Sequence, residues 1–359
     1  MTASTVVSMP SYTIGTDAIT MMPRVAQKLG DRILIIGGKT ALEKSKDKIE
    51  QALGAYGKIE FHSSWYGGEC TYENMETLIE EANRRESNLI LGVGGGKAID
   101  TAKGVAEKLD MPVITLPTIA STCAATTALS IVYTERGDFA DLYYLDHCPV
   151  HIFVDTTIIA ESPWRYQWAG IGDAMAKFYE TKATTRGKAL SHSVQLGKQI
   201  SCLCAAPMRE CGIKAVQDNK NQVDSHDLRE VILNSIISTG LASILIGQEN
   251  NGAAAHGLFY GMTMLPEIEQ HHLHGEVVAY GILFLLMLDE DREEIRRLYP
   301  FYKEIGWPTC LKDLNLSREA ISEAVVEKAL GASDMGKMPY KVTREKLLKA
   351  IDDLEAFTP

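Results

Sequence analysis

Several features that would define a protein class at once are missing from this sequence. Basic side chains number 36 against 47 acidic ones, which gives a net charge of −11. Such a chain is poorly suited to nucleic acid or to an anionic membrane, so neither is expected as a partner. The seven cysteines are scattered and form no CxxC pair. Reduced thiols are therefore expected, in place of a disulfide framework or a cysteine-rich zinc cluster.

Long hydrophobic runs are also missing. The longest apolar run extends from residue 277 to 288, which is shorter than the roughly 20 residues that cross a bilayer. We expect it to form a buried helix. The first ten residues, MTASTVVSMP, have no basic stretch followed by an apolar core, so no signal peptide is expected. These absences favour a soluble, cytoplasmic protein.

The N-terminal part of the chain alternates short apolar runs with helical patterns. Strands of this kind, separated by helices, are typical of βαβ units and of a parallel sheet covered on both faces. β-like segments also occur at 131–133 and 151–154. The expected strands lie at 12–15, 32–36, 58–63, 89–93 and 112–116, and the expected helices at 18–29, 40–53, 72–85 and 97–109.

A glycine-rich turn interrupts this pattern. The apolar run 89–93 stops at Gly94, Gly95 and Gly96, and a helical pattern starts at Lys97. Glycines let a ligand approach bare backbone N–H groups, and the following helix contributes its positive end. The turn therefore predicts a phosphate site. The alternative is a tight strand-to-helix turn without a ligand, because the spacing matches neither the dinucleotide fingerprint nor the P-loop.

From about residue 162 onward the chain shows helical patterns only. The length of 359 residues suggests about two domains. We place an α/β domain at 1–162 and an all-α domain at 163–359. One continuous domain with unevenly distributed strands is the alternative. The expected helices lie at 173–184, 190–204, 208–215, 226–246, 253–264 and 277–289.

Three polar residues in the helical half predict a metal site. Asp173 follows a GIG segment, His256 lies in AAAHG, and His274 lies in HHLHGEV. One carboxylate and two imidazoles can hold a divalent metal and leave a position open for substrate. The small residues beside them would let their helices converge. Alternatively, Asp173 only favours a helix start or pairs with Lys177, His256 is a core histidine, and His274 is in a solvated loop.

Taken together, these stretches resemble the iron-containing alcohol dehydrogenase family, and in particular its glycerol dehydrogenase-like branch. The similarity extends over nearly the whole chain. It rests on ordered blocks at 67–70 (GGEC), 94–103 (GGGKAIDTAK), 117–122 (PTIAST), 128–130 (ALS), 154–156 (VDT), 169–174 (AGIGDA), 253–256 (AAAH) and 274–276 (HGE).

The resemblance implies an N-terminal Rossmann-like domain and a helical C-terminal domain, the architecture that dehydroquinate synthase shares, with the chemistry in a cleft between them. It implies Asp173, His256 and His274 as ligands of zinc or iron, a small-molecule substrate, and a homo-oligomer. It also implies an NAD or NADP site, with Gly95, Gly96 and Lys97 at the pyrophosphate. Thr127, Leu129 and Tyr133 would line the nicotinamide side. The whole cofactor set is Gly38, Lys39, Gly94, Gly95, Gly96, Lys97, Asp100, Thr118, Ser121, Thr127, Leu129 and Tyr133.

One departure from the glycerol branch concerns the substrate. That branch has a polyol-binding Asp where this chain has Cys123, followed by Ala124 and Ala125. A neutral residue leaves extra hydroxyls unpaired and does not repel a carboxylate. The same Cys-Ala-Ala sequence resembles a hydroxycarboxylate dehydrogenase subgroup. Cys123 as simple apolar lining is the alternative.

Two further departures concern the cofactor and the metal. Relatives that use NAD commonly have an Asp at the position of Gly38, where it would repel a 2′-phosphate. Its absence beside Lys39 makes NADP permissible, unless Lys39 is only a solvated residue at a helix start. Phe259 stands where many relatives have a second histidine, so a proton relay through that position is not expected.

The leading hypothesis is therefore a metal-dependent NAD(P)-linked dehydrogenase that reduces short 2-oxoacids, with glycerol oxidation as its alternative. A lyase like dehydroquinate synthase is a second possibility. It requires several basic residues for a phosphorylated substrate, whereas the metal-site segments offer only Lys177. A non-catalytic metal- or nucleotide-binding protein is the third.

Overall fold

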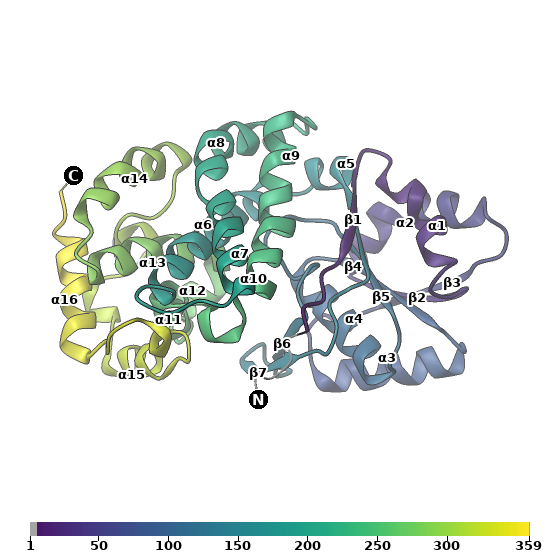
Figure 1. The fold of residues 1–359 in the computed structure, drawn as a ribbon, viewed down its shortest axis with the longest axis horizontal. Helices are drawn as coiled ribbons and strands as arrows, with labels where there is room; N and C mark the ends of the chain where they lie inside the picture. Colours follow the sequence, from purple (N-terminus) through teal and green to yellow (C-terminus); the bar gives the residue numbers. More distant parts are fainter. Residues whose placement is uncertain (1–5, 359) are drawn as a thin grey trace. The chain divides into compact units, whose positions relative to one another are not determined.

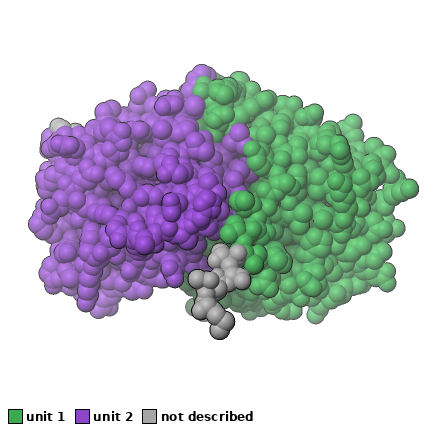
Figure 2. Space-filling view, viewed as in Figure 1, with its two compact units in different colours: residues 1–164, 218–232 green, residues 165–217, 233–359 purple. Residues whose placement is uncertain are grey.

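The structure is a computed structural model that describes residues 6–358. Residues 1–5, half of the segment in which no signal peptide was expected, and residue 359 lie outside the described part. The chain forms two compact units, residues 1–164 with 218–232 and residues 165–217 with 233–359 (Figure 2). The boundary lies close to residue 162. However, residues 218–232, which were expected in the helical domain, belong to the first unit.

The first unit contains a six-stranded parallel sheet with the order β1–β8–β5–β4–β2–β3. The chain runs outward from β2 to β3 and then crosses back to place β4 on the other side of β2. This reversal makes the carboxyl ends of β2 and β4 the switch point at which parallel sheets bind ligands. The strands are β1 (Ser11–Gly15), β2 (Arg32–Gly37), β3 (Glu60–Trp65), β4 (Leu89–Gly94), β5 (Val113–Pro117) and β8 (His151–Asp155).

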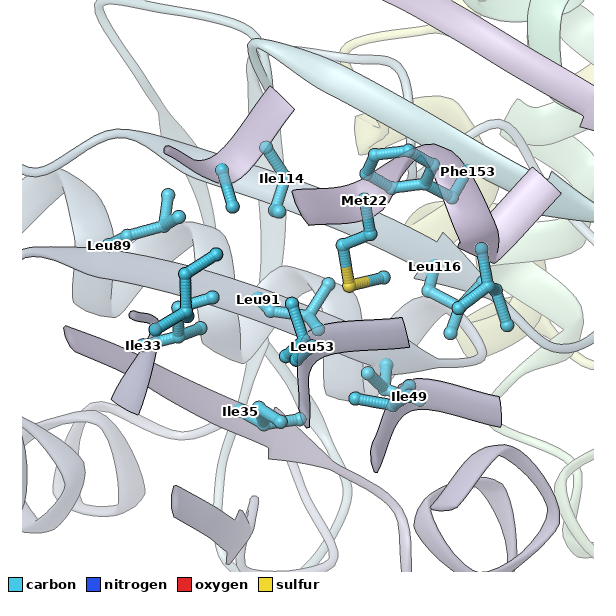
Figure 3. Close-up of a cluster of buried hydrophobic side chains, with 14 of the residues drawn as sticks. Met22, Ile33, Ile35, Ile49, Leu53, Leu89, Leu91, Ile114, Leu116 and Phe153 are labelled. Atoms are coloured by element: carbon cyan, nitrogen blue, oxygen red, sulfur yellow. The ribbon is translucent and has the colours of Figure 1, made fainter. Parts of the chain in front are cut away.

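Helices cover both faces of this sheet. In Figure 1, α1 (Met22–Ala26) and α2 (Lys39–Gly54) lie above the strands, and α3 (Tyr72–Arg84) and α4 (Gly96–Lys108) lie below them. The alternation of side chains along β2 supplies both cores, because Ile33 and Ile35 face one layer and Leu34 and Ile36 the other. Figure 3 shows the first of these cores, including Ile49 and Leu53 from α2.

Two local features of the first unit differ from expectation. The single helix expected at 18–29 is a 3₁₀ turn, Ala18–Met21, followed by α1, in which Pro23 lies in the first turn. An antiparallel hairpin stands apart from the sheet and consists of β6 (Leu129–Tyr133) and β7 (Phe139–Tyr144). Only the first strand of this hairpin was expected. The short helix α5 (Thr156–Ala160) follows β8.

In the second unit, every regular element within residues 165–217 and 233–358 is helical, as expected. One of its apolar helices is buried from Gly275 to Met287, which confirms the interpretation of 277–288 as a buried helix. The helices are α6 (Trp164–Thr184), α7 (His192–Ser201), α8 (Ala206–Lys220), α10 (Thr239–Ile246), α11 (Ala254–Met262), α12 (Pro266–His271), α13 (His274–Leu288), α14 (Arg292–Ile305), α15 (Glu323–Gly331) and α16 (Arg344–Glu355).

One continuous helical stretch meets the length and hydropathy of a membrane span. It comprises α9 (His226–Leu233), a π-helical turn (Asn234–Ser238) and α10. Of the most apolar 18-residue window in this stretch, 72% is buried inside the protein. A helix covered to this extent by its own chain is typical of a protein core.

Candidate metal centre and cofactor turn

Close helix packing brings the three predicted metal ligands together in the second unit. A Cβ on Gly172 of α6 would overlap the carbonyl oxygen of Gly275 on α13, and a Cβ on Gly275 would overlap the carbonyl oxygen of Ala169. A Cβ on Gly281 of α13 would lie 2.6 Å from the carbonyl oxygen of Ala255 on α11. The glycines therefore let α6, α11 and α13 approach at backbone contact, as their sequences predicted.

Asp173, His256 and His274 converge on one point. Asp173 Oδ1 lies 3.4 Å from His256 Nε2 and 3.2 Å from His274 Nε2. One ligand atom of each residue lies within 4.8 Å of the others. Ligand atoms about 2.0–2.2 Å from a tetrahedral zinc are separated from each other by about 3.3–3.6 Å. The donor types and their spacing therefore fit a divalent metal with one open position.

Glu180 holds His256 in the orientation that this arrangement needs. Its side chain is fully buried, and its Oε2 lies 2.7 Å from His256 Nδ1. Its Oε1 accepts hydrogen bonds from the backbone N–H of Ala253 at 2.8 Å and of His256 at 3.0 Å. The carboxylate thus caps the first turn of α11. Because Glu180 accepts a hydrogen bond from Nδ1, it reserves Nε2, the nitrogen that faces Asp173, as the atom available to a metal.

The electrostatics of this cluster favour a cation. Burial alone lowers the pKa of His256, but the carboxylates of Glu180 and Asp173 outweigh it and raise that pKa to about 10. Burial acts in the opposite sense on Asp173, and hydrogen bonds from His256 and His274 overcome it and lower the pKa of that carboxyl. Two ionised, buried carboxylates therefore flank His256, Glu180 at Nδ1 and Asp173 at Nε2. A divalent cation supplies the compensating charge.

His274 is positioned by its helix start and by an aromatic neighbour. It is the first residue of α13, whose beginning is fixed by Glu276 Oε2, which accepts from the backbone N–H of Leu273 at 3.1 Å. The Phe259 ring meets the His274 ring edge to face, with centroids 4.4 Å apart. Phe259, at the position where relatives have a histidine, thus restricts the rotation of His274, one of the candidate metal ligands.

Lys177 does not pair with Asp173, which was the alternative interpretation of that carboxylate. Instead, Lys177 donates a hydrogen bond to Asn251.

In the first unit, the glycine turn leads from β4 into α4 as predicted. Gly94 has φ of +144°, which favours glycine, and a Cβ on Gly95 would lie 2.7 Å from Ile119. Within the described residues, no side chain caps the first turn of α4. Its backbone N–H groups at Gly96 and Lys97 therefore begin the helix as an anion site would require.

Lys97 and Tyr133 lie together beside the turn. Lys97 Nζ is 2.6 Å from Glu69 Oε2 and 4.9 Å from the centre of the Tyr133 ring. The Lys97 side chain is 47% exposed, so its ammonium can exchange one anionic partner for another. The structure thus places two predicted cofactor residues, Lys97 and Tyr133, side by side, and Lys97 also pairs with a carboxylate from the GGEC block.

Gly38 and Lys39 lie at the carboxyl end of β2, next to β4. Gly38 N donates to the Val93 carbonyl oxygen at 3.3 Å. Gly38 has an ordinary backbone (φ −72°, ψ 147°), and the atoms nearest to a Cβ there would be 3.8 Å away, so a side chain would fit. Lys39 Nζ lies 4.3 Å from the centre of the exposed Trp65 ring. No carboxylate stands at position 38, as noted from the sequence.

The segment after β5 carries the remaining predicted residues. Thr118 N donates to the Gly94 carbonyl oxygen at 3.1 Å, which joins this segment to the glycine turn. Ser121 and Cys123 are partly exposed along it, and the carbonyl oxygens of Thr127 and Leu129 both accept from Lys103. These contacts bring the predicted nicotinamide-side residues and the Cys123 segment next to α4.

Asp100, which was expected among the cofactor residues, is buried and does not face a surface that a cofactor could contact. It is 5% exposed and faces the interior, where its Oδ1 lies 2.8 Å from Lys103 Nζ. Its Oδ2 accepts from the backbone N–H of Ile131 at 3.2 Å. Burial raises the pKa of Asp100, and Lys103 partly counteracts this effect. Its effect on a ligand would therefore pass through the residues it holds.

Sequence reasoning missed Glu180 and Lys103. Glu180 stands seven residues after Asp173 on α6, which is two helical turns and hence the same face. That spacing was the available signal, but a carboxylate two turns away is also ordinary on a solvated helix. Lys103 was noted only as part of a motif, and its burial follows from contacts that no local pattern indicates.

Comparisons with known proteins agree with this geometry. A family model described as iron-containing alcohol dehydrogenase matches residues 10–156. The chain is 33% identical to a glycerol dehydrogenase of Thermotoga maritima over 95% of this chain and 94% of the relative. It is 30% identical to hydroxycarboxylate dehydrogenase A of Escherichia coli over 91% and 90%. The crystal structure of a probable glycerol dehydrogenase from Sinorhizobium meliloti superimposes with a TM-score of 0.87 at 29% identity, covering 98% of each chain.

Proposed function

Because this chain belongs to the iron-containing alcohol dehydrogenase family, we propose that it is a metal-dependent, NAD(P)-linked enzyme that interconverts a small alcohol or hydroxy acid and its carbonyl compound. It is an oxidoreductase acting on alcohols. The observation that carries the proposal is the convergence of Asp173, His256 and His274, with Glu180 behind His256.

The three ligands define the role of the metal centre. A divalent zinc or iron ion held there would supply Lewis-acid chemistry toward an alcohol or carbonyl oxygen. Asp173 and Glu180 provide the negative charge that retains a cation. Glu180 keeps the Nδ1 proton of His256 away from the ligand position, and Phe259 keeps the His274 ring in place. These residues therefore orient the centre before any substrate binds.

The glycine turn supports a dinucleotide cofactor. A nicotinamide dinucleotide would supply the hydride acceptor or donor. The N-terminus of α4 and Lys97 suit its pyrophosphate, and the carboxyl end of β2 suits its adenosine ribose. Gly38 offers no carboxylate against a 2′-phosphate, and Lys39 offers a positive charge beside it. These two residues support NADP(H) over NAD(H).

For the substrate, we propose short 2-oxoacids and the corresponding 2-hydroxy acids. The support is the neutral segment Cys123-Ala124-Ala125, which does not repel a carboxylate. Similarity to a hydroxycarboxylate dehydrogenase is consistent with that preference.

Glycerol oxidation is the second candidate, and the comparisons support it equally. The relative from Thermotoga maritima and the structural neighbour from Sinorhizobium meliloti are both described as glycerol dehydrogenases, the latter as probable. Cys123 is the residue that separates the two candidates. A carboxylate side chain at this position would strengthen the binding of a polyol through hydrogen bonds to its hydroxyls, and it would weaken the binding of a carboxylate substrate through repulsion.

One experiment tests the function and the substrate together. Oxidation of NADH and of NADPH is followed with a panel of short 2-oxoacids, aldehydes and dihydroxyacetone, glycerol oxidation is measured in reverse, and metal content is determined on the same sample. We expect turnover with NADPH and a 2-oxoacid and about one metal per chain. Preference for glycerol and dihydroxyacetone would select the second candidate, and bound metal without turnover would support a non-catalytic protein. Substrate conversion without net NAD(P)H change would indicate a lyase.

Ligand variants test the metal centre itself. Asp173→Ala, His256→Ala and His274→Ala should each lose the metal and turnover. His271→Ala is the matched control, because that side chain is 59% exposed in the same histidine-rich stretch and lies outside the cluster. Full activity and metal content in any of the three ligand variants would show that its assignment as a ligand is wrong.

A further inference from the structure

Lys103 is a lysine with no exposure to solvent. It lies in the second turn of α4, and its side chain is 0% exposed. Desolvation of an ammonium is costly unless each of its protons finds an acceptor. An apolar residue would pack α4 against its neighbours without that cost. The partners of Lys103 therefore indicate what the ammonium contributes.

Those partners lie in one short segment. Lys103 Nζ donates to the carbonyl oxygens of Ala124 at 2.8 Å and Thr127 at 3.1 Å, and also to that of Leu129. The carboxylate of Asp100, one turn earlier on α4, lies 2.8 Å away and balances the charge. Three carbonyl groups within six residues thus converge on one ammonium. The segment wraps around Lys103.

Further contacts connect the same segment to α4 and β5. Ser130 Oγ donates to the Asp100 carbonyl oxygen at 2.9 Å, and Ile131 N donates to the Asp100 carboxylate at 3.2 Å. Thr115 Oγ1 of β5 donates to the Ala125 carbonyl oxygen at 3.0 Å. Between β5 and β6, residues 124–128 form no helix or strand. Side-chain contacts, rather than a regular backbone ladder, therefore determine the path of this segment.

We propose that Lys103 is a positioning residue that fixes the conformation of residues 123–129, and so determines where Cys123 and Thr127 are presented beside the glycine turn. Its stem belongs to the helix that begins at Gly96, so the phosphate turn and the segment that carries Cys123 move as one body. The consequence for substrate choice rests on the proposed function. The positioning itself does not depend on it.

The test compares Lys103→Met with Lys108→Met. Methionine keeps most of the length of the lysine stem and removes the ammonium, and Lys108 lies on the same helix but pairs with Glu76 at the surface. Hydrogen exchange by mass spectrometry follows the amides of Thr126 and Ile131, whose acceptors are the Cys123 carbonyl oxygen and Asp100. Thiol labelling of Cys123, localised by mass spectrometry, follows the segment from its start.

In Lys103→Met, we expect exchange over 124–131 and labelling of Cys123 to accelerate at least about ten-fold, with the amides of β4 unchanged. Lys108→Met should behave like the wild type. Equal protection and labelling in all three proteins would overturn the proposal. Uniformly faster exchange, including β4, would also overturn it, because that pattern indicates a general loss of stability.

If Lys103→Met does not fold, hydrogen exchange in the wild-type protein tests the proposal instead. Residues 124–131 should then open with the same free energy as β4, whereas exchange at the rate of an exposed loop would overturn the proposal. Neither readout requires turnover, so their failure is distinguishable from failure of the proposed function. Where turnover is measured, Lys103→Met should change the ratio of kcat/KM between a 2-oxoacid and glycerol, and Lys108→Met should not.

Discussion

Replacing Glu180 with Gln tests the arrangement behind His256. Glutamine is nearly isosteric with glutamate, so the packing of α6 against α11 is kept. The carboxylate accepts three hydrogen bonds, from His256 Nδ1 and from the backbone N–H groups of Ala253 and His256. An amide has only one oxygen, and its NH₂ group is a donor. In either orientation of the glutamine amide, its NH₂ group faces a hydrogen-bond donor, which is either His256 Nδ1–H or the backbone N–H groups of Ala253 and His256.

Each orientation has its own consequence. If the oxygen serves the two backbone groups, the NH₂ group faces Nδ1 and favours the tautomer with its proton on Nε2, the atom directed at Asp173. If the oxygen serves Nδ1, the start of α11 loses its cap. Changes to a residue behind a metal-binding histidine cost about 10–100-fold in metal affinity, which corresponds to about 1.4–2.7 kcal/mol.

The assay is zinc affinity, measured by competition with a chromophoric chelator on metal-stripped protein. Thermal unfolding with and without metal gives an independent value, since a weaker site yields a smaller metal-induced shift. Glu294→Gln is the matched control, because that carboxylate in the same unit accepts from Tyr179 and Arg297 and lies outside the ligand cluster. Wild-type zinc affinity in Glu180→Gln would refute the reasoning about the His256 tautomer.

Three further predictions concern the first unit. Gly38→Asp should lower kcat/KM for NADPH at least about ten-fold through repulsion of the 2′-phosphate, whereas neutral Gly38→Asn should not; equal effects would refute the charge argument. Cys123→Asp should raise the ratio of glycerol to 2-oxoacid turnover about ten-fold or more, with Cys123→Ser as the neutral control; an unchanged ratio would remove Cys123 from substrate selection. His151 forms hydrogen bonds through both ring nitrogens to Ser11 and Thr13 of β1, and burial lowers its pKa. Its contribution to stability is therefore fully present above about pH 6.5, where the imidazole is neutral in both the folded and the unfolded chain, and is lost as the pH falls. Hydrogen exchange of β1 between about pH 7 and pH 5 checks this, and His151→Gln should abolish the pH dependence.

The sequence predicted the parallel sheet for physical reasons that are local, and local residue types also indicated the candidate metal ligands, which the resemblance to a known family then favoured over their alternatives. Buried parallel strands require continuous apolar runs, and Ile33 to Ile36 form such a run with both faces covered. Glycine beside a ligand allows helices to touch, and Gly172 and Gly275 do so. Both signals are carried by residue types within one segment, so they can be read without knowledge of the fold.

The return of residues 218–232 to the first unit could not be read in this way. Helical periodicity records which face of a helix is apolar but not which domain covers that face. Asn219 shows the reason, because its side-chain amide donates to the carbonyl oxygens of Ile159, Ala160 and Ser162 at the end of α5. These partners are about 60 residues away in the chain, and an asparagine at a helix end also has common local uses.

Glu180, Lys103 and Phe259 fall under the same argument. A resemblance between sequences can place a residue in a motif, as it did for Lys103, or at a variable position, as it did for Phe259, but it does not give the partner that the residue meets from another segment. Glu180 meets the start of α11, Lys103 meets residues 124–129, and Phe259 meets the His274 ring. A charged side chain on a helix is most often solvated, so sequence alone favours the wrong environment for Glu180 and Lys103. Their burial is decided by the approach of other segments, and it turns ordinary helix residues into groups that hold the candidate ligands and the Cys123 segment in place.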